Sequence, residues 1–161
     1  MKLRAIMLWA SLALALGTVN WLALGRERLA ADGHVMYLDL APVDPRSLMQ
    51  GDYMDLRYAL ADRVPINESA AAGALVVRVD ELHYATFVRV HTPGAPLAPG
   101  EHLLRYRVRD GRALIGAESF FFQEGQAERF AAARYGELRV APDGTAALVG
   151  LRGDQLEPLG R

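Results

Sequence analysis

The sequence predicts an α+β protein that is predominantly β, with a single amino-terminal transmembrane helix before an antiparallel, β-rich exterior domain that contains one helix. Three observations predict this class. The chain of 161 residues begins with a long uncharged apolar run. After residue 33, apolar residues mostly recur at every second position, as in half-buried strands. One Ala-rich segment near residue 130 has helical spacing instead.

The apolar run extends from Ala5 to Gly25 and contains 21 residues without a charge. At about 1.5 Å per residue, a helix of this length spans roughly the 30 Å hydrocarbon core of a bilayer. Trp9 and Trp21 lie toward its two ends, where aromatic rings sit at the level of the lipid headgroups. The run therefore predicts a membrane anchor over residues 5–25.

The topology of this anchor follows from the lengths of its flanks. Basic residues on the two sides are nearly balanced, but a short tail (1–4) before a long domain (26–161) favours a cytoplasmic amino terminus and an extracytoplasmic domain. Two alternatives stay open. Residues 23–25 also fit the small-residue cleavage site of a signal peptide, removed after Gly25, and the run also fits a buried core helix.

Composition excludes several classes of chemistry. The chain has no cysteine, which excludes disulfides, thiolate metal sites, Cys nucleophiles and iron–sulfur ligation. Its 18 basic and 19 acidic residues argue against nucleic-acid binding. Lys2 is the only lysine, so the domain lacks a partner for a Ser–Lys dyad, and the four histidines lack the spacing of a metal site. We therefore predict no catalytic residue, no cofactor and no metal.

The exterior domain is expected to consist of short strands separated by turns and two loops. Glu81-Leu82 is predicted to form the tight turn of a hairpin, and residues 142–144, Pro-Asp-Gly, a second turn. A helix is expected from Gln126 to Tyr135, and loops at 62–72 and 92–100. The expected strands are 35–40, 53–59, 75–80, 83–91, 102–109, 113–122, 137–141 and 146–151.

Two segments carry a resemblance to a known family. The first follows Pro-Val-Asp-Pro-Arg, and the second contains three consecutive phenylalanines. On these residues the chain resembles the GDYXXLXY family of bacterial membrane-anchored proteins. The matching residues are Gly51, Asp52, Tyr53, Leu56 and Tyr58 in the first segment, and Gly116, Glu118, Glu124 and Gly125 in the second.

The resemblance implies a location and a partner but no reaction. It implies an inner-membrane protein with a periplasmic domain and, because members often accompany genes for polytopic membrane proteins, a polytopic partner. Our first hypothesis is therefore a non-enzymatic accessory module. The alternative is an envelope hydrolase or ligand-binding domain that uses Asp52 and Glu118.

The carboxylates near these segments admit both chemical and structural roles. A pair at suitable distance serves acid–base catalysis, and a tighter cluster holds Ca²⁺. The structural interpretation is that Asp52 caps its own turn, Asp55 faces water and Glu118 pairs with an arginine. Arg105, Arg107 and Arg109 are interpreted as lying on the solvent-facing side of a sheet. Alternatively, they form a surface that binds lipid headgroups or an acidic partner.

Overall fold

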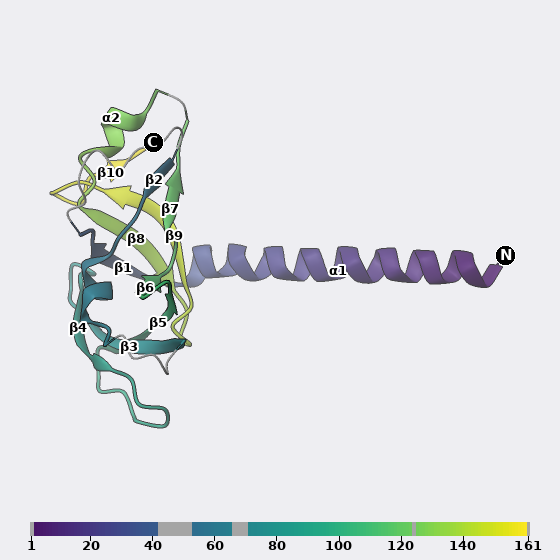
Figure 1. The fold of residues 1–161 in the computed structure, drawn as a ribbon, viewed down its shortest axis with the longest axis horizontal. Coiled ribbons are helices and arrows are strands. Elements are labelled where there is room, and N and C mark those ends of the chain that lie inside the picture. The colour runs from purple at the N-terminus through teal and green to yellow at the C-terminus, as the bar shows by residue number, and fades with distance from the viewer. Residues whose placement is uncertain (1, 42–52, 66–70, 124, 161) are drawn as a thin grey trace.

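Strands are the main regular structure of the chain beyond residue 33. The computed structural model describes residues 2–41, 53–65, 71–123 and 125–160, and Figure 1 shows its fold. The elements are α1 (Lys2–Asp32), β1 (His34–Asp39), β2 (Tyr53–Asp55), the 3-10 helix η1 (Ala59–Arg63), β3 (Ala72–Val79), β4 (Ala85–Val90), β5 (Glu101–Arg109), β6 (Arg112–Ile115), β7 (Ser119–Phe121), α2 (Ala127–Phe130), β8 (Tyr135–Val140), β9 (Ala146–Arg152) and β10 (Pro158–Leu159).

The strands form three antiparallel sheets, which confirms a predominantly β, antiparallel body. One four-stranded sheet has the order β1-β8-β9-β10, a second has the order β4-β3-β5-β6, and β2 pairs with β7. The two larger sheets enclose the main core, to which β1, β3, β5, β6 and β8 each contribute buried side chains. This arrangement leaves one side of each larger sheet for polar residues.

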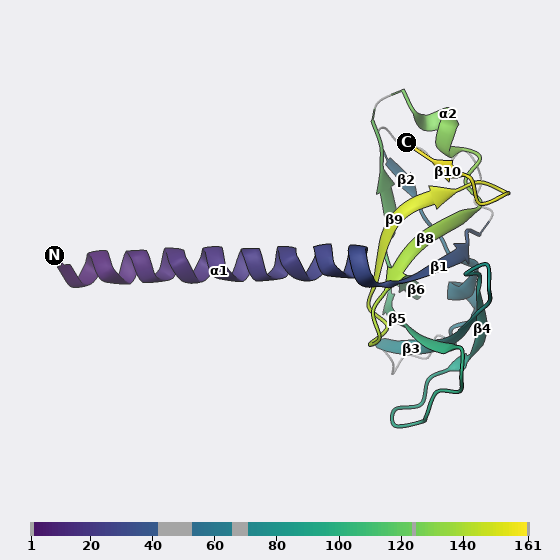
Figure 2. The ribbon, with the colours of Figure 1, turned by 180° about the vertical axis from the view of Figure 1, so that it is seen from behind.

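A second, smaller core lies beneath β2 and β7. Its buried members are Met54, Phe130 and Leu151, and partly buried phenylalanines of the 120–122 segment pack against them. Leu40 and Leu148 contact both cores. In Figures 1 and 2, β2, β7, α2 and β10 gather at one end of the body, and β3 and β4 lie at the other. The two cores are thus adjacent along one body.

Both predicted turns are confirmed by their hydrogen bonds. The Asp80 carboxylate accepts hydrogen bonds from the backbone N–H groups of Leu82 and Tyr84, both at 2.9 Å, and closes the β3–β4 hairpin. The Asp143 carboxylate accepts hydrogen bonds from the Thr145 N–H at 2.9 Å and the Thr145 hydroxyl at 3.0 Å between β8 and β9. Aspartate favours turns because its side chain bonds to backbone two residues on.

The expected strand over 113–122 is wrong in one respect, because the chain breaks into two strands at Gly116. Gly116 has φ +62°, a left-handed conformation that interrupts strand geometry and favours glycine. A Cβ at this position would also lie 3.0 Å from Leu138 Cδ2. The break lets β6 pair with β5 and β7 pair with β2, so the chain changes sheets here.

The expected helix over 126–135 is also wrong, since only Ala127–Phe130 is helical. The backbone after Phe130 forms hydrogen bonds with residues of other segments instead of helical ones. The Arg134 N–H donates to the Arg152 carbonyl, and the Arg134 carbonyl accepts from the Leu40 N–H, both at 2.8 Å. Sheet pairing therefore replaces the helical hydrogen bonds that the Ala-rich composition favours. Similarly, β2 ends at Asp55, before the expected 59.

Helix α1 contains the run expected to be helical and extends beyond it to Asp32. It leaves the body as a long rod with its amino terminus at the far end (Figures 1 and 2). Large apolar side chains are exposed along it: Met7, Trp9, Leu12, Leu14, Leu16, Val19, Trp21 and Leu24. Within the part of the chain that the structure describes, no helix is both long and apolar enough to cross a membrane.

A single residue, Gly33, separates α1 from β1. Its N–H donates to the Leu29 carbonyl at 3.0 Å, and its carbonyl accepts from the Arg139 guanidinium at 3.3 Å. A Cβ at Gly33 would lie 2.6 Å from the Leu29 carbonyl oxygen and 3.0 Å from the Val140 nitrogen. The close approach of α1 to the end of β8 therefore requires glycine.

Glu101 is the buried charged residue of the described body and ties three segments together. Its carboxylate accepts a hydrogen bond from Arg89 of β4 at 2.7 Å and from the Ala98 N–H of the preceding loop at 3.0 Å. Arg78 of β3 lies 3.9 Å away. The hydrogen bond from Arg89, then that from the Ala98 N–H, lowers the pKa of Glu101 below its usual 4.5.

Replacing Glu101 by Gln tests this contribution through its pH dependence. Because the pKa of Glu101 is lower in the folded state, its charge stabilises the fold above pH 4.5, and this stabilisation is lost as the pH falls below 4.5. We expect E101Q to have a lower urea midpoint than the wild type at neutral pH, with a difference that narrows below pH 4.5. Glu81→Gln, in the exposed β3–β4 turn, is the control and should follow the wild type. A difference for E101Q that is constant with pH would contradict the prediction.

Candidate functional site

The two segments that carry the family resemblance lie side by side. Strand β2 pairs with β7 in the register Tyr53↔Phe121 and Asp55↔Ser119. The pairing continues where the Leu56 N–H donates to the Glu118 carbonyl at 2.8 Å. Two stretches distant in sequence thus form one local structure.

The structure does not describe all of the predicted site residues. Gly51, Asp52 and Glu124 lie outside the described residues. Of the described site residues, the structure brings together Leu56, Tyr58 and Glu118, which line one pocket, whereas Tyr53 and Gly116 lie outside its lining. The predicted convergence of Asp52 with Glu118 stays a prediction. Gly125 is described, and its φ of +83° is a conformation that favours glycine.

The side chains of the first segment are divided between the two cores. Leu56 packs on the smaller core, and Tyr58 is buried in the main core with 2% of its surface exposed. Tyr53 is half-buried, with its ring centre 5.8 Å from that of Phe121. The two tyrosines thus occupy one core and one rim position, as their odd spacing predicts.

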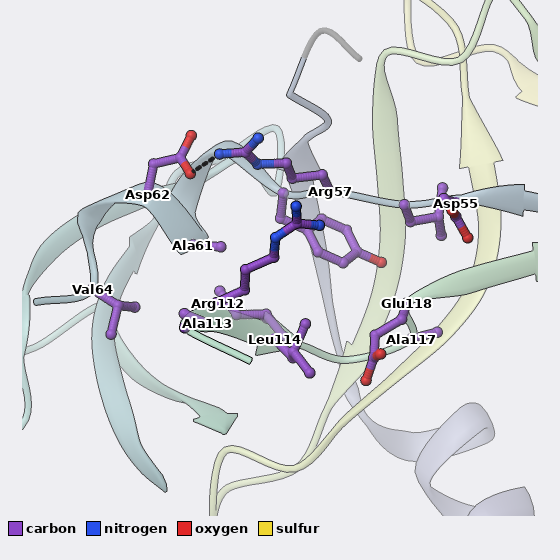
Figure 3. Close-up of a pocket in the computed structure, with 14 residues that line it drawn as sticks. Asp55, Arg57, Ala61, Asp62, Val64, Arg112, Ala113, Leu114, Ala117 and Glu118 are labelled. Carbon is purple, nitrogen blue, oxygen red and sulfur yellow. Dashed lines mark hydrogen bonds and ion pairs between the residues drawn. The ribbon is translucent and has the colours of Figure 1, made fainter. Parts of the chain in front are cut away.

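A pocket of about 620 Å³ lies beside this segment (Figure 3). Its walls come from residues 55–58, from η1 and the residue after it, from the β5–β6 turn with β6, and from residues 117–118. Small-molecule pockets are typically about 300–1,000 Å³. The pocket is therefore large enough for a small organic molecule.

Most of the carboxylates at this pocket are paired with arginines. Asp62 accepts a hydrogen bond from Arg57 at 2.6 Å, with both side chains exposed. The Glu118 carboxylate forms an ion pair with Arg107 of β5, as the structural interpretation of the sequence predicts. Asp55 lines the pocket and is exposed. Two of the three carboxylates that line the pocket are therefore engaged in ion pairs with arginines.

The Tyr58 hydroxyl is the unusual polar group of this site. It is buried, and no hydrogen-bond partner for it is present among the described residues. Burial raises the pKa of Tyr58 above its usual range, so the hydroxyl keeps its proton. Its ring lies over Gly136 of β8, where a Cβ would be 2.8 Å from Tyr58 Cε1. The site thus holds a neutral hydrogen-bond donor that no described residue engages.

A second pocket, of about 510 Å³, lies on the other side of the same segment. It shares Asp55, Leu56 and Arg57 with the first pocket and is closed by α2, by residues after it and by the loop before β10. Residues 55–57 are therefore the wall between two cavities.

The arginines of the predicted basic face are each close to an acidic side chain. Sequence reasoning did not single out Arg112, which is at the pocket. Arg105 lies 3.3 Å from Asp143, Arg107 pairs with Glu118, and Arg109 lies 3.6 Å from Asp110. Arg112, by contrast, lines the first pocket. No signal in its local sequence distinguishes it from the other arginines, because the pocket is built from segments distant in the chain.

The histidines show one proximity that their spacing does not predict. The rings of His34 and His102 lie 4.9 Å apart, at the start of β1 and of β5. Burial, then the charge of His34, lowers the pKa of His102. Within the described ranges, no three His, Asp or Glu residues are grouped to hold a metal ion.

Comparison with known proteins identifies the family. Residues 15–151 match the family described as GDYXXLXY protein, and this range includes both paired segments of the site. Comparison with curated proteins and with solved structures found no match. The match covers most of the chain, and this protein therefore belongs to the GDYXXLXY family.

Proposed function

We propose that this protein is a membrane-anchored, non-enzymatic accessory module. In this proposal residues 5–25 cross the inner membrane, residues 1–4 are cytoplasmic, and residues 26–161 are extracytoplasmic and bind a polytopic membrane protein. The observation that carries the proposal is helix α1, which leaves the body with large apolar side chains exposed along its length.

The distribution of these side chains supports a lipid environment for the helix. At about 100° per residue, Leu14, Leu16, Val19 and Leu24 project in different directions around the axis and do not form one stripe. A helix that is apolar on all sides is typical of a core or of a membrane span. The body covers none of these four side chains, which are all exposed.

Polar side chains within the run are compatible with hydrocarbon. The Thr18 hydroxyl donates to the Leu14 carbonyl at 2.8 Å, and the Asn20 amide donates to the Leu16 carbonyl at 3.0 Å. Polar groups satisfied within their own helix cost less in lipid than unpaired ones. The run therefore combines apolar surface with internally bonded polar groups.

Replacing Leu14 by Arg tests the anchor. An arginine near the centre of a membrane helix opposes insertion by about 2.5–3.5 kcal/mol, so we expect L14R to move from the membrane pellet to the alkaline-carbonate supernatant. Leu82→Arg, on an exposed turn of the body, is the matched control and should stay in the pellet. Carbonate resistance of L14R equal to that of the wild type would contradict the anchor.

Two further measurements separate the open alternatives. The intact mass of the membrane-bound protein distinguishes an uncleaved anchor from a chain cut after Gly25. Crosslinking at native expression tests the partner, and the accessory role predicts one polytopic membrane protein among the products. Crosslinking that recovers no membrane protein would remove this part of the proposal.

The hydrolase alternative has less support at its described carboxylate. Glu118 forms an ion pair with Arg107, so this carboxylate is engaged in a contact within the fold. The ligand-binding alternative is favoured by the pocket itself, whose polar groups include donors that the described chain leaves unused.

A further inference from the structure

The pocket of about 620 Å³ contains hydrogen-bond donors that the described chain does not use. We propose that this pocket binds a small organic anion, a carboxylate or a phosphate monoester on a short apolar tail, with its head on Arg112 and the Tyr58 hydroxyl. The proposal does not depend on how α1 associates with membranes.

Arg112 supplies the charge for such a head. In Figure 3 its side chain extends into the middle of the pocket, below Arg57. Arg57 is already paired with Asp62 at 2.6 Å, whereas Arg112 forms no ion pair with any described residue. Two guanidinium groups that share one cavity repel each other, and an oxyanion between them removes this repulsion.

The Tyr58 hydroxyl supplies a hydrogen-bond donor that is already buried from water. Binding a ligand therefore costs no further desolvation of this group. Tyr58 lines the pocket, and its hydroxyl is buried without a hydrogen-bond partner among the described residues. Buried polar groups without partners are rare in folded proteins, and each needs an explanation. An acceptor oxygen on a ligand in this pocket would satisfy the hydroxyl, and the high pKa that burial produces keeps it a donor.

The rest of the wall has space for an apolar tail. Ala61, Val64, Ala113 and Ile115 are buried side chains that line the same pocket. Apolar walls with a few convergent polar groups are typical of small-molecule sites. The chemistry of the lining therefore fits an anion with an apolar part better than a bare inorganic ion.

The acidic residues of the pocket affect how strongly an anionic head binds. In Figure 3, Asp55 and Glu118 lie together at one end, and Asp62 and Val64 lie at the other. Glu118 is neutralised by Arg107, which leaves Asp55 as the carboxylate without a described ion pair. Asp55 is therefore expected to repel the head and to weaken its binding.

The test uses the full chain in phosphatidylcholine nanodiscs and isothermal titration calorimetry at low salt. The probes are hexanoate, hexyl phosphate and, as a cation of similar shape, hexyltrimethylammonium, with empty nanodiscs as the blank. We expect both anions, or one of them, to bind and the cation not to bind. The stronger of the two anions identifies the head as carboxylate or phosphate.

Variants show whether the binding is at this pocket. Arg112→Gln should weaken anion binding roughly tenfold to a hundredfold, as expected for one charge-assisted hydrogen bond. Arg109→Gln, an exposed arginine outside the pocket lining, is the matched control and should bind as the wild type. Asp55→Asn should raise the affinity, because it removes the repulsion.

The Tyr58→Phe variant distinguishes an effect on anion binding from an effect on the stability of the fold. Because the hydroxyl has no hydrogen-bond partner among the described residues, its removal should leave the melting temperature unchanged or higher, while anion affinity falls roughly twofold to tenfold. Any one of three results would overturn the proposal: no binding of either anion at millimolar concentration, equal binding by Arg112→Gln and wild type, or tighter binding of the cation.

Discussion

Leu75→Ala is expected to destabilise the body by about 2–5 kcal/mol, the range for truncating a fully buried leucine. Leu75 is 0% exposed and lies on β3, between Val90 of β4 and Leu104 of β5. Its side chain packs in the main core, to which both larger sheets contribute. Truncation removes apolar burial and leaves a cavity that close-packed neighbours fill only in part.

The measurement is urea unfolding of the full chain, followed by circular dichroism. Leu82→Ala is the matched control, since Leu82 is on the turn that follows β3 and is 64% exposed. Exposed substitutions usually change stability by less than about 0.5 kcal/mol. Equal midpoints for the two variants would contradict the assignment of the main core.

Phe130→Ala is expected to cost about 3–5 kcal/mol, as for other buried phenylalanines. Phe130 is 2% exposed, and its ring centre lies 5.0 Å from that of Phe120 and 5.2 Å from that of Phe122. A Cβ at Gly160 would be 2.9 Å from its ring. One side chain of a four-residue helix thus connects β7, the residue after it and the carboxy-terminal segment.

Hydrogen exchange with mass-spectrometric detection shows which part of the protein loses stability in the Phe130→Ala variant. The smaller core is bounded by β2, β7, α2 and β10, so Phe130→Ala should accelerate exchange there first. Phe121→Ala is the control, because Phe121 neighbours this core in sequence but is 75% exposed. Accelerated exchange in β3 and β5 at the same rate as in β7 would show that the smaller core has no separate stability.

The parts of the fold that depend on neighbouring residues were predictable from the sequence. The hairpin of β3 and β4 follows from alternation on both sides of a short turn, and Asp80 and Asp143 close their turns through bonds within a few residues. The alternation over β5 likewise places Leu104 in the core and Arg105 in solvent. In each of these cases the structure depends on residues only a few positions apart in the sequence, which is the range over which a sequence pattern can be read.

The errors arose where distant strands compete with local preference. Residues 131–134 have helical composition, but the Arg134 backbone is bonded to Leu40 and Arg152, and these pairings are invisible to a local pattern. The same holds at the pocket. That Glu118 pairs with an arginine was predictable, but the role of Arg112 depends on β6 lying beside residues 55–58, which no spacing indicates.

The one-residue link at Gly33 fixes the rotational phase of the body relative to helix α1. Because α1 continues without a break to Asp32 and β1 begins at His34, each residue inserted into 26–32 would turn the body by about 100° about the helix axis and raise it by about 1.5 Å. In a membrane, the face that the body presents to a neighbouring protein would therefore depend on the number of residues in this segment, while their chemical character would matter less.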